Sequence, residues 1–242
     1  MKVAVTQFAP ELRNKSINIQ RMEDFCLEAH MLGANLVVFP ELATTGYAYL
    51  SEKAAREDAE VIGEKGETFS RMLEVARETN MTLVWGMMEV DPKTGMLHNS
   101  QVLLTPEGRW ETARKLNSFG NDFLWATPGT KPPPILTHLG HKIGLLICRD
   151  VRDKSDELDS IYSKGDASLV CFSANWGAGA FPANSWMSFV KNNNCWLAVS
   201  NRYGKEENLD FGFGGIGIIS PEGKVFCDGV RWGQDCMVVA DI

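Results

Sequence analysis

Three side chains, far apart in the sequence, each end a short apolar or strand-like segment and could together carry out covalent catalysis. They are Glu41, Lys115 and Cys148. In α/β sheets, ligands bind beyond the carboxyl ends of strands, so these positions are expected at one edge. A carboxylate, an ammonium and a thiol that meet there supply a general base, an electrostatic stabiliser and a nucleophile. The segments that they follow are 36–39, 110–114 and 143–147.

Each of these residues also has an ordinary interpretation. In that interpretation, Cys148 is a core cysteine, Glu41 is a strand-end residue that points to water, and Lys115 is a surface lysine. A polar stretch follows Cys148 at 149–154. A thiol at the border of a core and a cationic loop gains thiolate character, which favours the nucleophile.

The composition excludes several classes of protein. Of the 242 residues, 44% are hydrophobic and 23% are charged, which is typical of a folded α/β protein. The formal net charge is −7 and no basic stripe is present, so nucleic acid is not an expected partner. No apolar run is long enough for a membrane span, and membrane association is not expected. A strand-like segment at 2–8 leaves no room for a signal peptide, which predicts a cytoplasmic protein.

The six cysteines predict reduced thiols rather than a disulfide framework or a metal site. None belongs to a C-x-x-C pair, and most lie in apolar segments. The four histidines are scattered, and His138 and His141 have no cysteine nearby, so no zinc site is expected. The carboxylate-rich stretch 150–160 lacks the glycine of a calcium loop.

Strand-like and helix-like segments alternate along the whole chain, which predicts an α/β fold in one domain, residues 1–242. The neighbouring strand-like segments between 82 and 115 argue against a purely parallel sheet. The prolines of 128–134 predict a loop. The predicted helices are 18–32, 68–78, 156–163 and 183–193, and the predicted strands are 2–8, 36–39, 82–88, 100–104, 142–148, 168–173, 196–200, 215–219 and 237–240.

The sequence around the three residues resembles the nitrilase (carbon–nitrogen hydrolase) superfamily. Its motifs are a P-E pair after an apolar strand, an R-K pair and an I-C-x-D sequence, which correspond here to 39–42, 114–116 and 147–150. Further segments are similar to the family in the same order: 98–100, 106–108, 173–176, 200–204, 213–215 and 220–223.

This resemblance implies a four-layer α-β-β-α sandwich, paired as a homodimer, and an amidase that hydrolyses small non-peptide amides through a thioester. Glu41 would be the base, Cys148 the nucleophile, and Lys115 with the backbone N–H of Arg149 would stabilise the oxyanion. The expected partners are a small amide substrate and water, and neither a metal nor an organic cofactor is needed.

Two departures from the family pattern concern the edge of the site. The family commonly has a second glutamate after the lysine, where this chain has Asp122, which would orient Lys115 if it reaches it. The short stretch that usually follows the cysteine is replaced by the more charged 152–157. In N-carbamoyl amino acid hydrolases of the family, an arginine near Arg152 binds the substrate carboxylate, whereas an ion pair with Asp150 or Asp153 is the alternative here. Trp176 and Tyr47 are the other expected substrate-binding residues.

Other functions remain open at this point. Within the family, the alternatives are a nitrile hydrolase and a carbamoyl-amide hydrolase. Outside it, the chain could be a binding module whose catalytic site has decayed. The glycine string 212–217 matches G-x-G-x-x-G, but a strand-like run follows it instead of a helix, which argues against a dinucleotide site.

Overall fold

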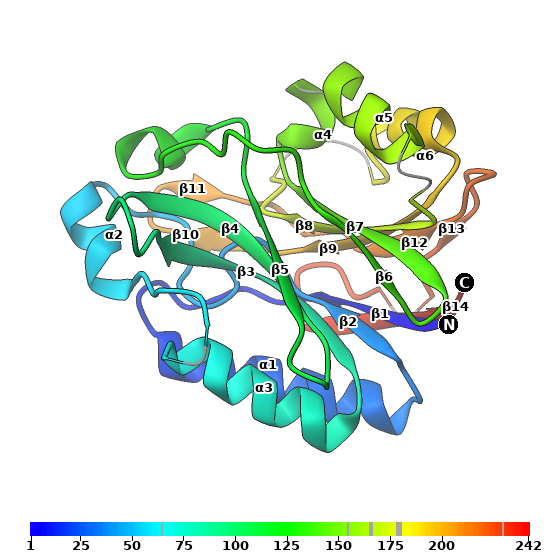
Figure 1. The fold of residues 1–242 in the computed structure, drawn as a ribbon, viewed down its shortest axis with the longest axis horizontal. Helices are drawn as coiled ribbons and strands as arrows, with labels where there is room; N and C mark the ends of the chain where they lie inside the picture. Colours follow the sequence, from blue (N-terminus) through cyan, green and yellow to red (C-terminus); the bar gives the residue numbers. More distant parts are fainter. Residues whose placement is uncertain (64, 154, 165–166, 178–180, 229) are drawn as a thin grey trace.

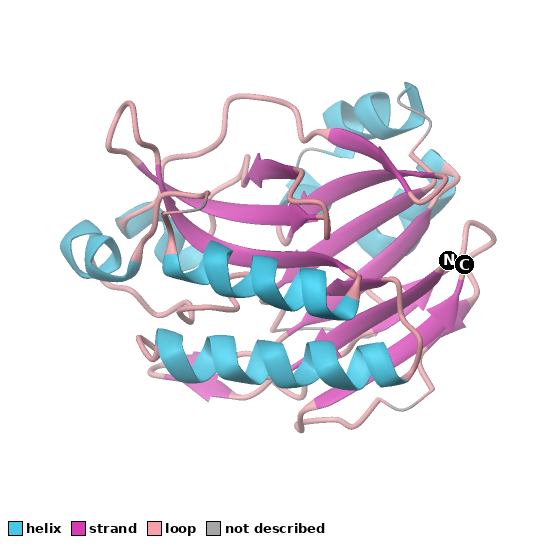
Figure 2. Ribbon diagram, turned by 60° about the horizontal axis from the view of Figure 1, so that its bottom comes forward, coloured by secondary structure: helices cyan, strands magenta, loops and turns pink. Residues whose placement is uncertain are grey.

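Four layers of secondary structure make up this protein, whose computed structural model describes residues 1–63, 65–153, 155–164, 167–177, 181–228 and 230–242 (Figure 1). Helices α1 (Lys15–Met31) and α3 (Glu67–Thr79) cover one outer face, where Figure 2 shows them side by side. Helices α4 (Asp150–Asp153), α5 (Ser155–Lys164) and α6 (Asn184–Asn193) lie on the other. The α-β-β-α sandwich that the sequence predicts is thus confirmed.

The two inner layers are halves of one mixed sheet with the order β5-β4-β3-β2-β1-β9-β8-β7-β6. Strands β1, β2 and β3 pair in parallel, and so do β7, β8 and β9. A single residue pair, Gln7 with Asn201, joins β1 to β9, so the halves fold over one another. These strands are β1 (Lys2–Gln7), β2 (Leu36–Val38), β3 (Thr82–Val90), β4 (Leu97–Leu104), β5 (Trp110–Arg114), β6 (Ile135–His138), β7 (His141–Ile147), β8 (Leu169–Ala174) and β9 (Trp196–Asn201).

Shorter elements complete the fold. Strand β14 runs antiparallel to β1, and β12 runs antiparallel to β9. Strands β10 and β11 form a separate hairpin. Their bounds, with those of the remaining elements, are α2 (Glu52–Asp58), the 3-10 helix η1 (Gly120–Leu124), β10 (Lys205–Glu206), β11 (Leu209–Asp210), β12 (Gly217–Ile219), β13 (Val225–Phe226) and β14 (Cys236–Asp241).

The core follows from the alternation of side chains along the strands. In β1, Val3 and Val5 point between the two half-sheets, whereas Ala4 faces the helices α1 and α3. In the other half, Leu145 and Leu169 point into the same inter-sheet layer. Because residues two apart share one face of a strand, each half-sheet supplies an apolar surface to both of its neighbours.

The long periodic segments of the sequence form the predicted elements, with bounds that differ by a few residues. The segment 128–134 is a loop, as its prolines predict. The sequence did not predict α2, α4, η1, β6, β10, β11 and β13, which are short or lack a clear apolar period. The glycine-rich segment 212–217 runs into strand β12 and not into a helix, as expected.

Two features are absent from the described part of the chain. No helix there is long and apolar enough to cross a membrane. Histidine, cysteine, aspartate and glutamate side chains do not gather there into a group of three that could hold a metal ion.

Candidate active site

The carboxyl ends of β2, β5 and β7 bring Glu41, Lys115 and Cys148 together. Glu41 follows β2 after two residues, and Lys115 and Cys148 directly follow β5 and β7. All three side chains are buried, with 1%, 3% and 6% of their residue surface exposed, respectively. The sheet therefore places three chemically reactive groups in a nearly dry environment.

Lys115 is a buried ammonium held between two carboxylates. Its Nζ donates to Glu41 Oε1 and to Asp122 Oδ2, both at 2.6 Å. Burial by itself would lower the pKa of Lys115, but the negative charges of Glu41 and Asp122 outweigh it and raise the pKa well above its ordinary value. The lysine is thus positively charged, and the interpretation as a surface lysine does not hold.

Glu41 is held by three donors from different parts of the chain. Besides Lys115, the side chain of Asn99 donates to Oε1 at 2.8 Å, and the backbone N–H of Asn175 donates to Oε2 at 2.9 Å. Such fixed donors orient the carboxylate and satisfy it in the absence of water. Glu41 does not point to solvent.

Asp122 reaches the lysine although it is one methylene shorter than the usual glutamate. It lies in η1, a short helical turn that carries it inward until it is fully buried. Asn99 Nδ2 donates to its Oδ1 at 3.1 Å, and the backbone N–H of Phe119 donates to its Oδ2 at 3.1 Å. The turn compensates for the shorter side chain.

Cys148 has a left-handed backbone conformation, with a φ of 42°. A non-glycine residue in this region is strained, and such strain gathers at functional sites. Its backbone N–H donates to the carbonyl oxygen of Ser173 at 2.9 Å, which ties the turn to strand β8.

The Cys148 thiol differs from the sequence-based expectation of thiolate character. Burial, followed by the negative charge of Glu41, raises its pKa well above the ordinary value, and a hydrogen bond to Glu41 adds to this. Lys115 and the backbone N–H of Asn175 act in the opposite direction but do not prevail. The expectation is wrong because the polar loop after the cysteine does not expose it, so burial and the charge of Glu41 outweigh the nearby cation.

Asp150 connects the cysteine turn to the lysine segment. Its carboxylate accepts from the backbone N–H groups of Leu116 and Asn117, at 3.0 and 2.8 Å, and from the Asn117 side chain. Burial raises the pKa of Asp150 to about 7, against the influence of these donors. The Asp150 carboxylate therefore has its hydrogen-bond partners in the 116–117 segment, and these account for its burial without an ion pair to Arg152. The side chain of Asp153, the other predicted partner of Arg152, lies outside the described residues.

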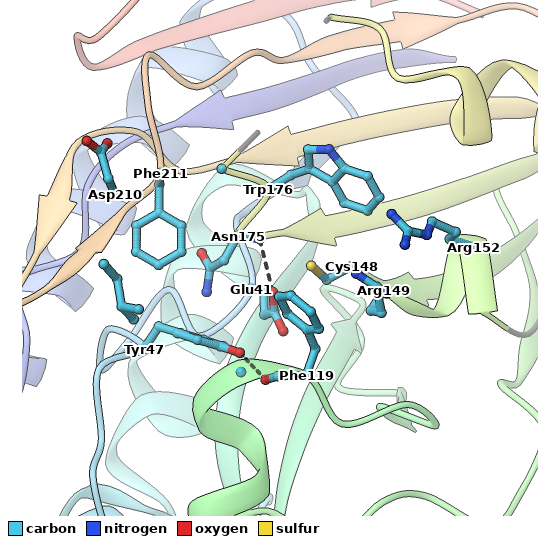
Figure 3. Close-up of a pocket in the computed structure, with 13 residues that line it drawn as sticks. Glu41, Tyr47, Phe119, Cys148, Arg149, Arg152, Asn175, Trp176, Asp210 and Phe211 are labelled. Carbon is cyan, nitrogen blue, oxygen red and sulfur yellow. Dashed lines mark hydrogen bonds between the residues drawn. The ribbon is translucent and has the colours of Figure 1, made fainter. Parts of the chain in front are cut away.

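A cavity of about 310 Å³ opens above these groups (Figure 3). Glu41 and Cys148 line it, together with four of the residues predicted from the sequence: Tyr47, Arg149, Arg152 and Trp176. Lys115 and Asp122 lie behind Glu41 and do not line it. Figure 3 shows Tyr47 and Phe211 on one side of Cys148 and the two arginines on the other. The volume suits a small ligand.

Several residues of the site were not predicted from the sequence, among them Asn99, Asn175, Phe119 and the cavity residue Phe211. Asn99 connects Glu41 and Asp122, although its N-S dipeptide was noted only as a family likeness. Asn175 lines the cavity and is 9% exposed, yet neither polar atom of its side chain has a hydrogen-bond partner in the described structure. Phe119 lines the cavity from the segment before η1. Asn99 and Asn175 stand at or near strand ends, which is the signal that could have identified them.

Comparisons with known proteins agree with this geometry. The family model described as carbon-nitrogen hydrolase matches residues 2–242. A nitrilase from Pyrococcus abyssi is 30% identical over 233 residues, which cover 93% of this chain and 83% of the relative. An (R)-stereoselective amidase from Pseudomonas sp. is 26% identical over 233 residues, which cover 96% of this chain and 81% of the relative.

A solved structure has the same fold. It is a variant of an amidase from Nesterenkonia sp. AN1, in which acrylamide has been added to the active-site cysteine. The two structures superpose with a TM-score of 0.83 at 23% identity, over 100% of this chain and 93% of the other. With the family model matching nearly every residue and a nitrilase 30% identical over most of both chains, the chain belongs to the carbon–nitrogen hydrolase (nitrilase) family.

Proposed function

We propose that this protein is an amidase that hydrolyses small, linear, non-peptide amides, with Cys148 as nucleophile, Glu41 as general base and Lys115 as electrostatic stabiliser. The observation that carries the proposal is the buried hydrogen-bonded set of Lys115, Glu41 and Asp122, whose member Glu41 lines a small cavity beside the Cys148 thiol. The nitrilase and amidase relatives are consistent with this chemistry.

The first half of the reaction forms a thioester. Glu41 accepts the thiol proton while the sulfur attacks the amide carbon, and the carbonyl oxygen becomes an oxyanion. Lys115 and the backbone N–H of Arg149 stabilise this oxygen, and one such donor is typically worth about 3–4 kcal/mol. Glu41 then gives its proton to the nitrogen, the C–N bond breaks, and ammonia or an amine leaves.

The second half restores the enzyme. Glu41 removes a proton from water, whose oxygen attacks the thioester carbon. The C–S bond breaks, the carboxylic acid leaves, and the proton returns to the sulfur through Glu41. Because the resting thiol is neutral, Glu41 must accept a proton in both halves of the reaction. Its three fixed donors keep the carboxylate in one orientation for both steps.

Release of ammonia from a panel of primary amides, carbamoyl amides and nitriles tests this function. We expect the amides to have the highest kcat/KM and Cys148→Ala to abolish turnover. Cys227→Ala is the matched control, because Cys227 is a half-buried cysteine that does not line the cavity. Faster turnover of nitriles would identify a nitrile hydrolase. If wild type and Cys148→Ala are equally silent on every compound, a binding module is the better interpretation.

Arg152 is proposed to bind a carboxylate on the substrate, such as that of an ω-amide or an N-carbamoyl amino acid. It lines the cavity on the side opposite Tyr47 and Phe211 (Figure 3). A guanidinium can bind a carboxylate through two parallel hydrogen bonds. Arg152→Gln should therefore raise KM about tenfold for a carboxylate-bearing amide and leave a neutral amide unchanged. An equal rise for both amides would contradict this role.

A homodimer is the assembly that we propose from the family likeness. Sedimentation equilibrium of the purified protein at micromolar concentration measures its mass directly. A mass of one chain, 26.8 kDa, would exclude the dimer.

A further inference from the structure

Behind the cavity, the carboxylate of Glu206 holds together two segments that are far apart in the sequence. Its Oε1 accepts the backbone N–H groups of Tyr47 and Ala48, both at 2.6 Å. Its Oε2 accepts from Arg202 Nη1 at 2.5 Å. Both members of this ion pair are buried, with 1% of Arg202 and 6% of Glu206 exposed.

Gly46 allows the carboxylate to come this close to the loop. A Cβ at this position would lie 2.6 Å from Glu206 Oε2 and 3.0 Å from Leu12 Cα. The φ of Gly46 is also positive, at 79°, a conformation that other residues rarely adopt. The loop after Glu41 is therefore shaped to receive Glu206.

Arg202 connects the pair to Phe211, a second residue of the same cavity wall. Its guanidinium lies over the ring of Phe211, 4.3 Å from the centroid. Phe211 in turn meets the edge of Tyr47, with ring centroids 5.9 Å apart. The contacts close a circuit from Glu206 through Tyr47 and Phe211 to Arg202.

Neither member of the ion pair lines the cavity, but Tyr47 and Phe211 both do. Glu206 also lies in β10, opposite Leu209 of β11, and Leu209 is another residue of the cavity wall. A planar guanidinium stacked on a ring and paired with a carboxylate fixes both groups in orientation.

We propose that the buried Arg202–Glu206 pair is a positioning device that sets the aromatic wall of Tyr47 and Phe211, and thereby determines which acyl groups the enzyme accepts. This inference rests on the proposed amidase function. A short acyl group stays beside Cys148, whereas a longer one extends to the aromatic wall. The pair therefore affects long acyl groups and leaves the chemistry at Cys148 unchanged.

Glu206→Gln removes the device with little change in volume. If the amide oxygen of the glutamine keeps the N–H groups of Tyr47 and Ala48, its NH₂ group faces the donor on Arg202. If the amide is turned around, the NH₂ group faces the two backbone N–H groups. In either case one of the two sets of hydrogen bonds is lost, either to Arg202 or to the Tyr47 and Ala48 N–H groups. Only a carboxylate has an acceptor oxygen for each set.

The test compares kcat/KM for hexanamide and acetamide, measured as ammonia release. We expect Glu206→Gln to lower the ratio of hexanamide to acetamide about tenfold, mainly through a higher KM for hexanamide. A purely structural role would reduce the fraction of active enzyme, which lowers both values and leaves the ratio unchanged. A ratio within twofold of wild type would overturn the proposal.

Arg202→Lys keeps the test decisive if Glu206→Gln does not fold. The lysine retains a cation for Glu206 but lacks the guanidinium plane over Phe211. We expect the same direction of change in the ratio, by about threefold. Glu52→Gln is the matched control, since Glu52 forms an exposed pair with Arg56 at the same i,i+4 spacing. It should leave the ratio unchanged.

A second readout does not depend on turnover. Iodoacetamide and its longer homologue 2-bromohexanamide alkylate a thiol with loss of halide, and mass spectrometry of the Cys148 peptide gives both rates. The labelling ratio is the rate with 2-bromohexanamide divided by the rate with iodoacetamide. If wild type hydrolyses no amide but this ratio falls in Glu206→Gln, the proposed function fails and the positioning role stands. If wild type is active and both ratios are unchanged, the positioning role alone fails.

Discussion

At the scale of single residues, one buried ammonium shared by two carboxylates defines the candidate site. Lys115 makes 2.6 Å hydrogen bonds to both Glu41 and Asp122, so the buried group of three has a net negative charge. Burial and then the negative charge of Glu41 raise the pKa of the neighbouring Cys148 thiol. The resting thiol is therefore neutral, and the proposed reaction requires Glu41 to accept the thiol proton during the attack.

The Cys148 thiol should stay protonated through neutral and mildly alkaline conditions. Its pKa is raised above the ordinary value by burial and by Glu41, and a raised pKa favours the neutral form of an acid at higher pH. The ultraviolet absorbance of the thiolate, taken as wild type minus Cys148→Ala from about pH 6 to about pH 9, should remain flat. Other cysteines cancel in this difference. An absorbance step below about pH 8 would contradict the raised pKa.

Asp122→Asn should lower kcat by about tenfold to a hundredfold. Without the second carboxylate, Lys115 loses one of its two fixed acceptors, so its Nζ is no longer held in one position beside Glu41. Steady-state kinetics on the best amide measures the effect. Asp235→Asn, at an exposed partner of Arg21, is the control and should retain the wild-type kcat. An unchanged kcat in Asp122→Asn would mean that the negative charge of Asp122 does not contribute to turnover.

At the scale of elements, close approach between neighbouring segments sets the position of Glu41, the proposed base. Gly86, on β3, lies beneath the turn that carries Glu41. A Cβ at Gly86 would lie 2.5 Å from the backbone nitrogen of Leu42 and 2.6 Å from Glu41 Cα. The φ of Leu42 is 49°, so this turn already has a strained conformation. A glycine in the middle of a strand here has a steric purpose.

Gly86→Ala should therefore displace Glu41 and lower kcat about a hundredfold, since a shift of about 1 Å can have this effect. Gly140→Ala is an informative control: its φ of 77° makes alanine strained, but nothing lies within 4 Å of the added Cβ. The control should lose stability and keep kcat. Thermal melts and kinetics on both variants separate the loss of stability from the loss of kcat. A wild-type kcat in Gly86→Ala would show that the turn can move to accept the Cβ without displacing Glu41.

At the scale of the whole molecule, the layer between the two half-sheets supports both groups of strands that carry the site. Leu169, on β8, is fully buried in this layer, whereas Leu27, on α1, is 51% exposed. Both are leucines in regular secondary structure, so they form a matched pair for measuring what burial contributes.

Leu169→Ala should lower the free energy of unfolding by about 2–5 kcal/mol, through lost burial and the cavity that remains. Leu27→Ala should change it by no more than about 0.5 kcal/mol. Urea unfolding measures both. Equal effects of the two substitutions would contradict the four-layer packing.

The sequence by itself determined the alternation of elements and the three reactive residues. Apolar periods identify the long helices and strands because the two sides of each element face different surroundings, and residues at strand ends are displayed at one sheet edge. The motifs around Glu41, Lys115 and Cys148 predicted the family, which the match over residues 2–242 confirms.

Only the tertiary structure decided how these groups are charged and held. Asn99 and Asn175 contact Glu41 across gaps of 58 and 134 positions, and no local pattern records such pairings. The protonation of Cys148 likewise depends on burial and on a carboxylate more than 100 positions away. Electrostatic interactions depend on distance and exposure in space, and both are set when the sheet folds over itself.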